Sequence, residues 1–384
     1  MLGYFLAPRV ALGVGAFEQL SALGSHRSWL LVDPALAELP KVRLIEEELV
    51  KEGGTVVRWL APPGEPTPGG LEQARASITS VQPDWVVAVG GGSVLDLAKW
   101  AWLAYERPDL PLAGGGPTEE LGLRQRARFV AVPTTCGSGS ESTGTAYLWD
   151  GEGGGRTVSS RELVADWVVL DPELLRSLPA RWVASTAADA LAHGLEALLS
   201  EWANPLSSAM AREAVGTILR ELPKAVRHPE TEEPRLQLQV AATLAGLAVA
   251  NSQLGLVHAL AHALGPRLGL AHSVAVAALV PYGAEFNFGA GRDRLATLER
   301  TLGAGPLQSG HALAERLRLL WESVALPRTL GAAGVTPERL GRHREAILTD
   351  ALRSPALLSN PRVPTRQELE RLLDAAMTGG PVPP

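Results

Sequence analysis

The sequence is short of three things that would place it in particular classes of protein: cysteine, lysine and uninterrupted apolar segments. Its one cysteine, Cys136, excludes a framework of internal disulfide bonds and fits a reducing compartment. The apolar segment at the start of the chain lacks a basic leading region and is broken by Pro8, Arg9 and glycines, which argues against a signal peptide. We therefore expect a cytoplasmic protein.

No segment is suited to crossing a membrane or to binding nucleic acid. The most apolar internal stretch, residues 241–264, is interrupted by polar and ionisable side chains, so we interpret it as a buried helix. The 35 basic residues are outnumbered by 41 acidic ones, and no run rich in Lys or Arg offers a footprint for a phosphate backbone. Neither a membrane nor nucleic acid is an expected partner.

The length and patterning of the chain indicate two domains. The 384 residues, 46% hydrophobic and 20% charged, are typical of a globular protein too long for one ordinary core. Up to residue 175, strand-like apolar runs alternate with helical periodicity, which predicts βα units around a mostly parallel sheet. Beyond that point helical periodicity rich in Ala and Leu dominates. We expect an α/β domain over residues 1–178 and an all-helical domain over residues 179–384.

A glycine-rich turn joins one of the predicted strands to a helix. The apolar run 85–89 leads into Gly90, Gly91, Gly92 and Ser93, and helical periodicity begins directly afterwards. Glycines let a diphosphate approach the backbone, and a helix N-terminus offers free N–H groups and a partial positive charge. The alternative is an ordinary tight turn with Ser93 as N-cap. The spacing matches neither the G-x-G-x-x-G fingerprint nor a Walker loop, so a different nucleotide fold is implied.

Polar residues at the ends of two other strands are further cofactor candidates. Asp33 ends the strand 28–33, where a carboxylate could bind an adenosine ribose and repel a 2′-phosphate, although it could equally be a turn residue before Pro34. The strand 128–133 runs into a loop whose hydroxyls and bare N–H groups suit a pyrophosphate or a nicotinamide amide. The candidates from this loop and from the helix after the glycines are Thr134, Thr135, Ser138 and Asp96.

Four of the eight histidines and one aspartate form a pattern that suggests a metal site. Asp189 and His193 are four residues apart on an apolar helix, His258 and His262 repeat that spacing, and His272 follows a Gly/Pro turn. Buried carboxylates and imidazoles are costly unless they pair or bind a cation, and this mixture suits Fe(II) or Zn(II). The alternative is a set of hydrogen-bonded core histidines. Spacing alone does not show which three histidines would be ligands.

The ordered motifs GGGSVLDLAK, PTTCGSGSE, DALAHGLE and GLVHALAHALG, followed by AHSVA and LVPY, strongly resemble the iron-containing, or group III, alcohol dehydrogenases. The resemblance spans nearly the whole chain and implies metal ligands at Asp189, His193, His258 and His272. His262 is then a second active-site histidine and not a ligand. The resemblance also implies a dinucleotide bound across the N-terminal domain, its nicotinamide facing the metal in a cleft between the domains.

The sequence departs from the family pattern at three positions. Ser273 stands where a glycine usually follows the last ligand, and Glu65 replaces the asparagine common before Pro-Thr. Arg156 takes the place of a lysine expected near the nicotinamide. Asp33 falls where members that prefer NAD carry an aspartate. The loop 141–150 resembles members that act on short, sometimes phosphonate-bearing, aldehydes.

We therefore expect an NAD(P)-linked alcohol dehydrogenase or aldehyde reductase acting on a small alcohol or aldehyde, with NAD preferred because of Asp33. The metal, Fe(II) or alternatively Zn(II), would hold the substrate oxygen during hydride transfer at nicotinamide C4, and His262 would relay the proton. We expect a homodimer. One alternative is a lyase similar to dehydroquinate synthase, disfavoured because lysine occurs only four times. The other is a nucleotide-sensing module with a structural metal.

Overall fold

The computed structural model describes residues 7–24, 26–110, 120–149, 155–302 and 308–382. The chain divides into two compact units, Met1–Leu178 and Pro179–Pro384. The first unit contains strands and helices, and the described part of the second contains helices only. The expected fold class, an α/β part followed by a helical part, is confirmed.

A six-stranded sheet forms the centre of the first unit, in the order β1-β8-β5-β4-β2-β3, and every neighbouring pair in it is parallel. The predicted parallel sheet is therefore confirmed. Its central strand β4 is buried along its whole length, which explains its continuous apolar sequence. The strands are β1 (Arg9–Leu12), β2 (Arg27–Val32), β3 (Thr55–Leu60), β4 (Trp85–Gly90), β5 (Arg128–Pro133) and β8 (Trp167–Leu170).

Two features of the first unit were not predicted. The first is the edge strand β1, and the second is an antiparallel hairpin of β6 (Thr145–Trp149) and β7 (Gly155–Ser159). Both β1 and β7 are short, largely exposed strands without a continuous apolar run. Patterning by hydrophobicity finds strands that are buried, so it passes over strands of this kind.

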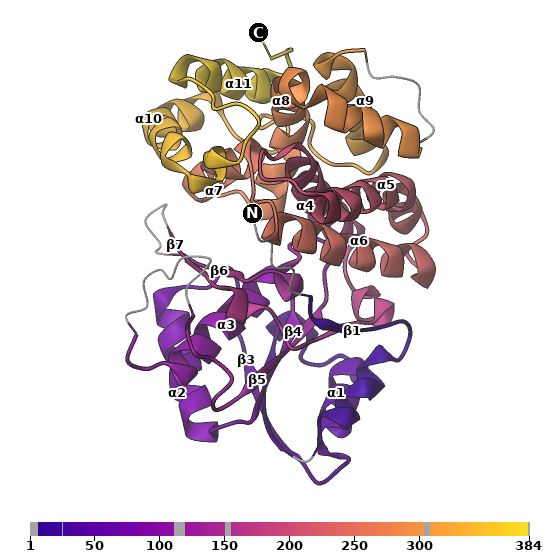
Figure 1. The fold of residues 1–384 in the computed structure, drawn as a ribbon, viewed down its shortest axis with the longest axis vertical. Coiled ribbons are helices and arrows are strands. Elements are labelled where there is room, and N and C mark those ends of the chain that lie inside the picture. Colours follow the sequence, from indigo (N-terminus) through magenta and orange to yellow (C-terminus); the bar gives the residue numbers. More distant parts are fainter. Residues whose placement is uncertain (1–6, 25, 111–119, 150–154, 303–307, 383–384) are drawn as a thin grey trace. The chain divides into compact units, whose positions relative to one another are not determined.

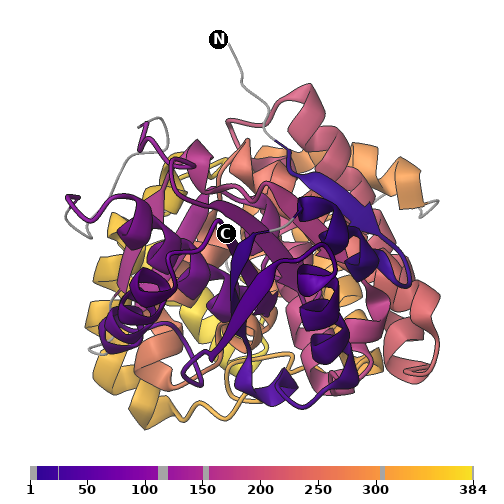
Figure 2. The same ribbon diagram turned by 90° about the horizontal axis from the view of Figure 1, so that it is seen from below.

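Helices cover both faces of the sheet, as Figures 1 and 2 show. Helix α1 (Pro40–Val50) packs with the 3₁₀ helix η1 (Ala16–Leu23), and α2 (Pro68–Val81) packs with α3 (Gly92–Glu106). The chain moves outward from β2 to β3, returns to β4 on the other side of β2, and continues to β5 and β8. The direction of winding thus reverses between β2 and β4, and ligands of open α/β sheets bind beyond the strand ends at such a point.

The second unit is built from eight long helices in the residues that the structure describes. Helix α4 is buried over most of its length and packs against α5, α6 and α8, while α7 packs against α8 and α10. In the described ranges no helix is long and apolar enough to cross a membrane. The helices are α4 (Ala180–Leu199), α5 (Pro205–Arg227), α6 (Glu232–Ala250), α7 (Leu256–Leu268), α8 (His272–Leu302), α9 (Gly310–Ser323), α10 (Pro337–Arg353) and α11 (Arg366–Thr378).

Candidate metal centre and cofactor site

The glycine turn lies at the end of β4, next to the point where the winding of the sheet reverses. Gly91 is the N-cap of α3, and no side chain caps this helix. Ser93 lies in the first turn, where its hydroxyl donates to Glu65 Oε2 at 2.8 Å. The alternative in which Ser93 is the N-cap is therefore wrong, because Gly91 occupies that position. The first N–H groups of α3 are left without a side-chain acceptor from the cap position.

The glycine turn and the loop after β5 pack against each other. A Cβ atom on Gly90 would lie 2.5 Å from Val94 Cβ, and one on Gly92 would lie 2.7 Å from Ser138 Cβ. At Gly91 the nearest atom would be Thr135 Cγ2, at 3.1 Å. Close packing alone thus requires glycine at two of the three positions, and Gly91 is the one where an added methyl group meets least protein.

Two ionisable side chains of α3, Asp96 and Lys99, support this loop, and sequence analysis did not single out Lys99. Asp96 accepts hydrogen bonds from Ser140 Oγ at 2.6 Å and from the Tyr147 backbone N–H at 2.8 Å. The ammonium of Lys99, which is fully buried, donates to the backbone oxygens of Ser140, Thr143 and Thr145. Burial lowers the pKa of Lys99 to about 8, and it raises the pKa of Asp96. Both side chains therefore form hydrogen bonds to other residues of the same unit.

The remaining cofactor candidates lie at the ends of strands or on the hairpin. Asp33 directly follows β2, and its carboxylate accepts the Ala35 backbone N–H at 2.9 Å, so it also acts as the turn residue that the alternative described. Thr134 is buried and donates its backbone N–H to the Gly90 oxygen at 3.0 Å. Arg156 is an exposed residue of β7, opposite Leu148. A hollow beside the glycine turn is lined by residues that include Glu65 and Ser93.

Three helices of the second unit bring together three of the four predicted metal ligands, while a ligand atom of His193 does not join this group. Asp189 lies on α4, His258 lies on α7, and His272 is the first residue of α8. One carboxylate oxygen and one ring nitrogen from each histidine lie within 4.8 Å of one another. Asp189 Oδ1 is 3.3 Å from His258 Nε2 and 3.5 Å from His272 Nε2. This is the only such group of three or more among the described residues.

The two other histidines of the cluster flank this group. The His193 ring stacks on the His258 ring with centroids 4.4 Å apart, and its Nδ1 is buried without a hydrogen-bond partner in the described part of the chain. The His262 ring stacks on the His272 ring at 5.1 Å and meets the His258 ring edge-on at 5.9 Å. Ser273, which departs from the family pattern, is also buried beside the cluster, and its hydroxyl donates to Ser185 Oγ at 3.1 Å.

Burial and mutual contact shift the protonation of these groups in opposite directions. Burial opposes ionisation of Asp189, but the imidazoles of His193, His272 and His258 hold its pKa well below the ordinary value. Burial lowers the pKa of His193 to about 4, and burial with neighbouring imidazoles also lowers the pKa of His262. Burial likewise disfavours charge on His258, yet the carboxylates of Glu196 and Asp189 raise its pKa to about 10. The cluster therefore combines the ionised Asp189 with two imidazoles that stay neutral, His193 and His262, and one that is protonated, His258.

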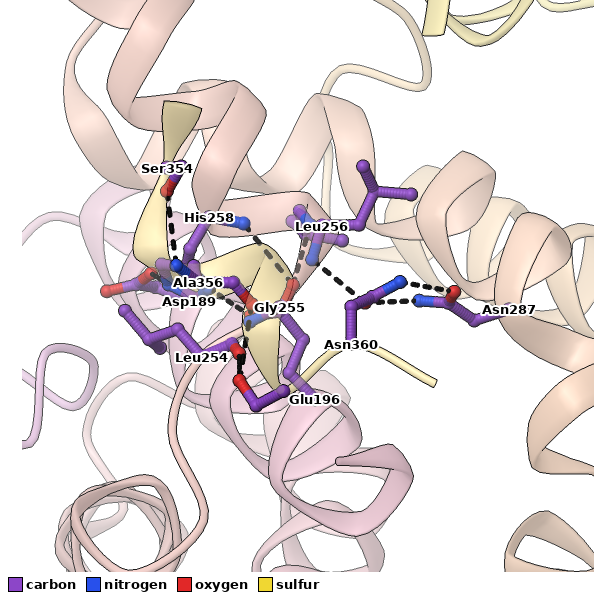
Figure 3. A network of polar contacts seen from close by, with 12 residues as sticks. Asp189, Glu196, Leu254, Gly255, Leu256, His258, Asn287, Ser354, Ala356 and Asn360 are labelled. Carbon is purple, nitrogen blue, oxygen red and sulfur yellow. Dashed lines mark hydrogen bonds and ion pairs between the residues drawn. The ribbon is translucent and has the colours of Figure 1, made fainter. Parts of the chain in front are cut away.

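Glu196 completes the cluster, although sequence analysis did not single it out. It lies on α4 seven residues after Asp189, so both side chains project from the same face. Its Oε2 is 2.6 Å from His258 Nδ1, and its carboxylate also accepts backbone N–H groups at the start of α7 (Figure 3). The i, i+4, i+7 spacing of Asp189, His193 and Glu196 was the available signal.

Comparison with known proteins gives relatives that span nearly the whole chain. It is 34% identical to a probable alcohol dehydrogenase, EutG, of Salmonella typhimurium over 97% of this chain and 94% of that protein. An iron-containing alcohol dehydrogenase from Thermococcus thioreducens matches with a TM-score of 0.89, 28% identity and coverage of 98% and 100%. A sulfoacetaldehyde reductase from Bifidobacterium kashiwanohense, solved with NAD⁺, matches with a TM-score of 0.85, 24% identity and coverage of 98% and 99%.

Two family models divide the chain at the same place as its fold. The model described as iron-containing alcohol dehydrogenase matches residues 7–172, and the model for the C-terminal part of the Fe-containing alcohol dehydrogenase family matches residues 183–377. This family uses a divalent metal and a nicotinamide cofactor, and its members are oxidoreductases that act on alcohols and aldehydes. The chain belongs to the iron-containing alcohol dehydrogenase family.

Proposed function

We propose that this enzyme holds Fe(II), or alternatively Zn(II), through four side chains of the helical unit and uses NAD to oxidise a small alcohol or reduce the corresponding aldehyde. The proposed ligands are Asp189, His193, His258 and His272. The observation that carries the proposal is the convergence of a carboxylate and two imidazoles within 4.8 Å, from three separate helices.

The residues present fit a divalent cation. The Nδ1 atom of His193 is buried with no hydrogen-bond partner in the described residues, a cost that a rotated ring bound to a cation would remove. Asp189 is 3% exposed and stays ionised, so it supplies a permanent negative charge that needs compensation. One carboxylate with several imidazoles is a donor set of intermediate hardness, which suits Fe(II) or Zn(II).

The side chains around the cluster have distinct roles in the proposed reaction. When bound, the metal supplies Lewis acidity that favours alkoxide character at the substrate oxygen while hydride passes to or from nicotinamide C4. His262 is half-buried, one turn after His258, and its lowered pKa keeps the ring neutral at physiological pH. A neutral imidazole there can accept the alcohol proton and pass it towards solvent.

For the cofactor, we propose that the backbone N–H groups of Gly91, Gly92 and Ser93 bind the pyrophosphate. The uncapped start of α3 and the close packing of the turn support this assignment. Asp33, beside the turn at the end of β2, would bind the adenosine ribose and disfavour a 2′-phosphate, which makes NAD the preferred cofactor. We further propose cofactor contacts from the hydroxyl loop after β5, through Thr134, Thr135 and Ser138. Asp96 of α3 and Arg156 of the hairpin are the remaining proposed contacts.

We also propose that two copies of the chain form a dimer in the cytoplasm. Strand β1 is an edge of the sheet and pairs only with β8 among the described residues, and it exposes Val10 and Leu12, with Val14 just beyond it. Such an edge is a template for pairing with another chain. A reducing compartment is consistent with a sequence whose one cysteine, Cys136, is buried.

The two alternatives considered from the sequence are not favoured. A lyase similar to dehydroquinate synthase needs basic groups converging on an acidic substrate, and Lys99, the lysine nearest the glycine turn, is buried against loop carbonyls. Membership of a family of alcohol dehydrogenases argues against a nucleotide-sensing module without enzymatic activity.

A substrate panel tests the proposed reaction, cofactor and metal together. Protein reconstituted without oxygen with Fe(II), and in parallel with Zn(II), would be assayed against short alcohols and aldehydes by absorbance of the reduced cofactor. We expect turnover with NAD(H) above that with NADP(H), and higher activity with Fe(II). Turnover that requires NADP(H), or that persists after the metal has been removed and shown to be absent, would contradict the proposal.

A further inference from the structure

We propose that Glu196 is a positioning residue of the metal centre, which fixes His258 so that its Nε2 faces the other ligands. The proposal rests on the ligand set given above. Glu196 is buried on the same face of α4 as Asp189, two turns further along the helix. Its Oε2 lies 2.6 Å from His258 Nδ1, and on the other side of the ring His258 Nε2 lies 3.3 Å from Asp189 Oδ1.

The hydrogen bond decides which ring nitrogen can bind a cation. A neutral imidazole carries one proton, and either nitrogen can hold it. Both oxygens of Glu196 already accept backbone N–H groups, so the carboxylate is an acceptor towards Nδ1, holds the ring proton there and leaves the Nε2 lone pair for the cation. Without this partner, His258 could bind through either nitrogen or rotate away from Asp189.

The same carboxylate also fixes the start of the helix that carries His258. Gly255, the N-cap of α7, has no side chain to satisfy the first N–H groups of the helix. Glu196 accepts three of them instead, from Gly255 at 2.9 Å, Val257 at 2.6 Å and His258 at 3.3 Å. A Cβ atom on Gly255 would lie 3.1 Å from the Glu196 carboxyl carbon. One group therefore sets both the position of the helix and the orientation of its metal ligand.

Asn360 provides a matched control at the same helix end. Its Oδ1 accepts the Leu256 N–H at 3.0 Å, and its amide pairs with Asn287 through two hydrogen bonds (Figure 3). Asn360 therefore caps α7 much as Glu196 does, but none of its hydrogen bonds reaches the His258 ring. Replacing it tests the structural role of a buried cap without disturbing the proton on His258.

Glu196→Gln separates the proton-holding role from the packing role, because it keeps the size of the side chain. The amide has one accepting oxygen and one donating NH₂ group, whereas Glu196 accepts with both oxygens. If the NH₂ faces His258, the ring proton must move to Nε2 and occupy the lone pair needed for the cation. If it takes the place of Oε1 instead, it opposes the backbone N–H groups of Val257 and His258 at the start of α7. Either arrangement weakens metal binding.

The test measures the dissociation constant for Zn(II) by competition with a chromophoric chelator, together with thermal unfolding of the metal-free proteins. We expect Glu196→Gln to bind Zn(II) about 10- to 100-fold more weakly than the native protein, the range found for partners of metal-bound histidines. Asn360→Ala should lower the unfolding temperature and bind Zn(II) within about twofold of the native protein, since no ligand partner is lost. Native affinity in Glu196→Gln, or equal weakening in both variants, would overturn the positioning role.

Two further measurements keep the outcome clear. In the native protein loaded with Zn(II), nitrogen NMR of the His258 ring should find the proton on Nδ1, and a proton on Nε2 would overturn the proposal even if Glu196→Gln does not fold. His272→Ala separates this proposal from the proposed function. Zn(II) retained at native affinity by His272→Ala would refute the ligand set, whereas its loss there with native affinity in Glu196→Gln would refute only the role of Glu196.

Discussion

Loading the metal centre should release a proton from His258, and the cost of that release sets the pH dependence of metal affinity. At about pH 7.5 Asp189 is already ionised and His193 is already neutral, because their pKa values lie well below neutrality. His258, with a pKa near 10 between two carboxylates, still carries both ring protons in the metal-free protein. A cation that binds Nε2 must displace one of them.

The size of this effect on metal affinity follows from the difference between the pKa of His258 and the pH of the assay. A group with a pKa of about 10 loses its proton at pH 7.5 at a cost of about 3 kcal/mol, since each pH unit corresponds to about 1.4 kcal/mol. Because the pKa of His258 is raised, the proton competes with the metal ion for Nε2 most strongly at low pH. Metal affinity should therefore rise about tenfold for each unit of pH increase from about 7.5 towards the pKa of His258.

Isothermal titration calorimetry with Zn(II) measures the number of protons directly, from the binding enthalpy in buffers of different ionisation enthalpy at one pH. At least one proton should be released for each ion bound at about pH 7.5, and a water molecule held by the ion can add to this number. Release of no proton, with affinity independent of pH between about 7.5 and 9, would refute a protonated His258.

Three other predictions concern the cofactor and the identity of the ligands. Asp33→Gly should raise the efficiency with NADP relative to NAD by about tenfold, as expected from removing a repulsive charge at the ribose, and an unchanged ratio in steady-state kinetics would exclude Asp33 from that site. Gly91→Ala should weaken NADH binding in a fluorescence titration while Gly69→Ala, where an added Cβ meets nothing within 4 Å, should not; native affinity in both would exclude the turn from the pyrophosphate site. Purified His272→Ala should lack metal, whereas His262→Ala should keep it and lose turnover. Elemental analysis with the reverse result would falsify the ligand set.

Much of the fold could be predicted because its two parts bury their side chains differently. The strands β2, β4 and β5 are almost entirely buried, so their sequences are continuous apolar runs that stand out beside the amphipathic helices between them. Strands β1 and β7 did not stand out, because they are short and largely exposed and so lack a continuous apolar run.

The residues of the candidate site could be predicted where their type is unusual in an apolar helix. Histidine and aspartate in helices rich in Ala and Leu attracted attention, whereas glutamate is common on helix surfaces, so Glu196 was passed over although it is as buried as Asp189. Spacing gave equal weight to His258 and His262, because four-residue separation places both on one face of α7. Only the approach of α4 and α8 distinguishes them, and that approach depends on contacts between residues distant in sequence.

The two units hold their buried cations in different ways. In the α/β unit the ammonium of Lys99 lies among three backbone oxygens, as a bound potassium ion would, but it is covalently part of α3. No chelator can extract it, so the shape of the hydroxyl loop does not vary with the supply of ions. The cluster around Asp189 holds only the proton of His258 in the metal-free protein, and the ion that we propose to replace this proton exchanges with solvent. Depletion of metal should thus leave the α/β unit intact while loosening the helical unit.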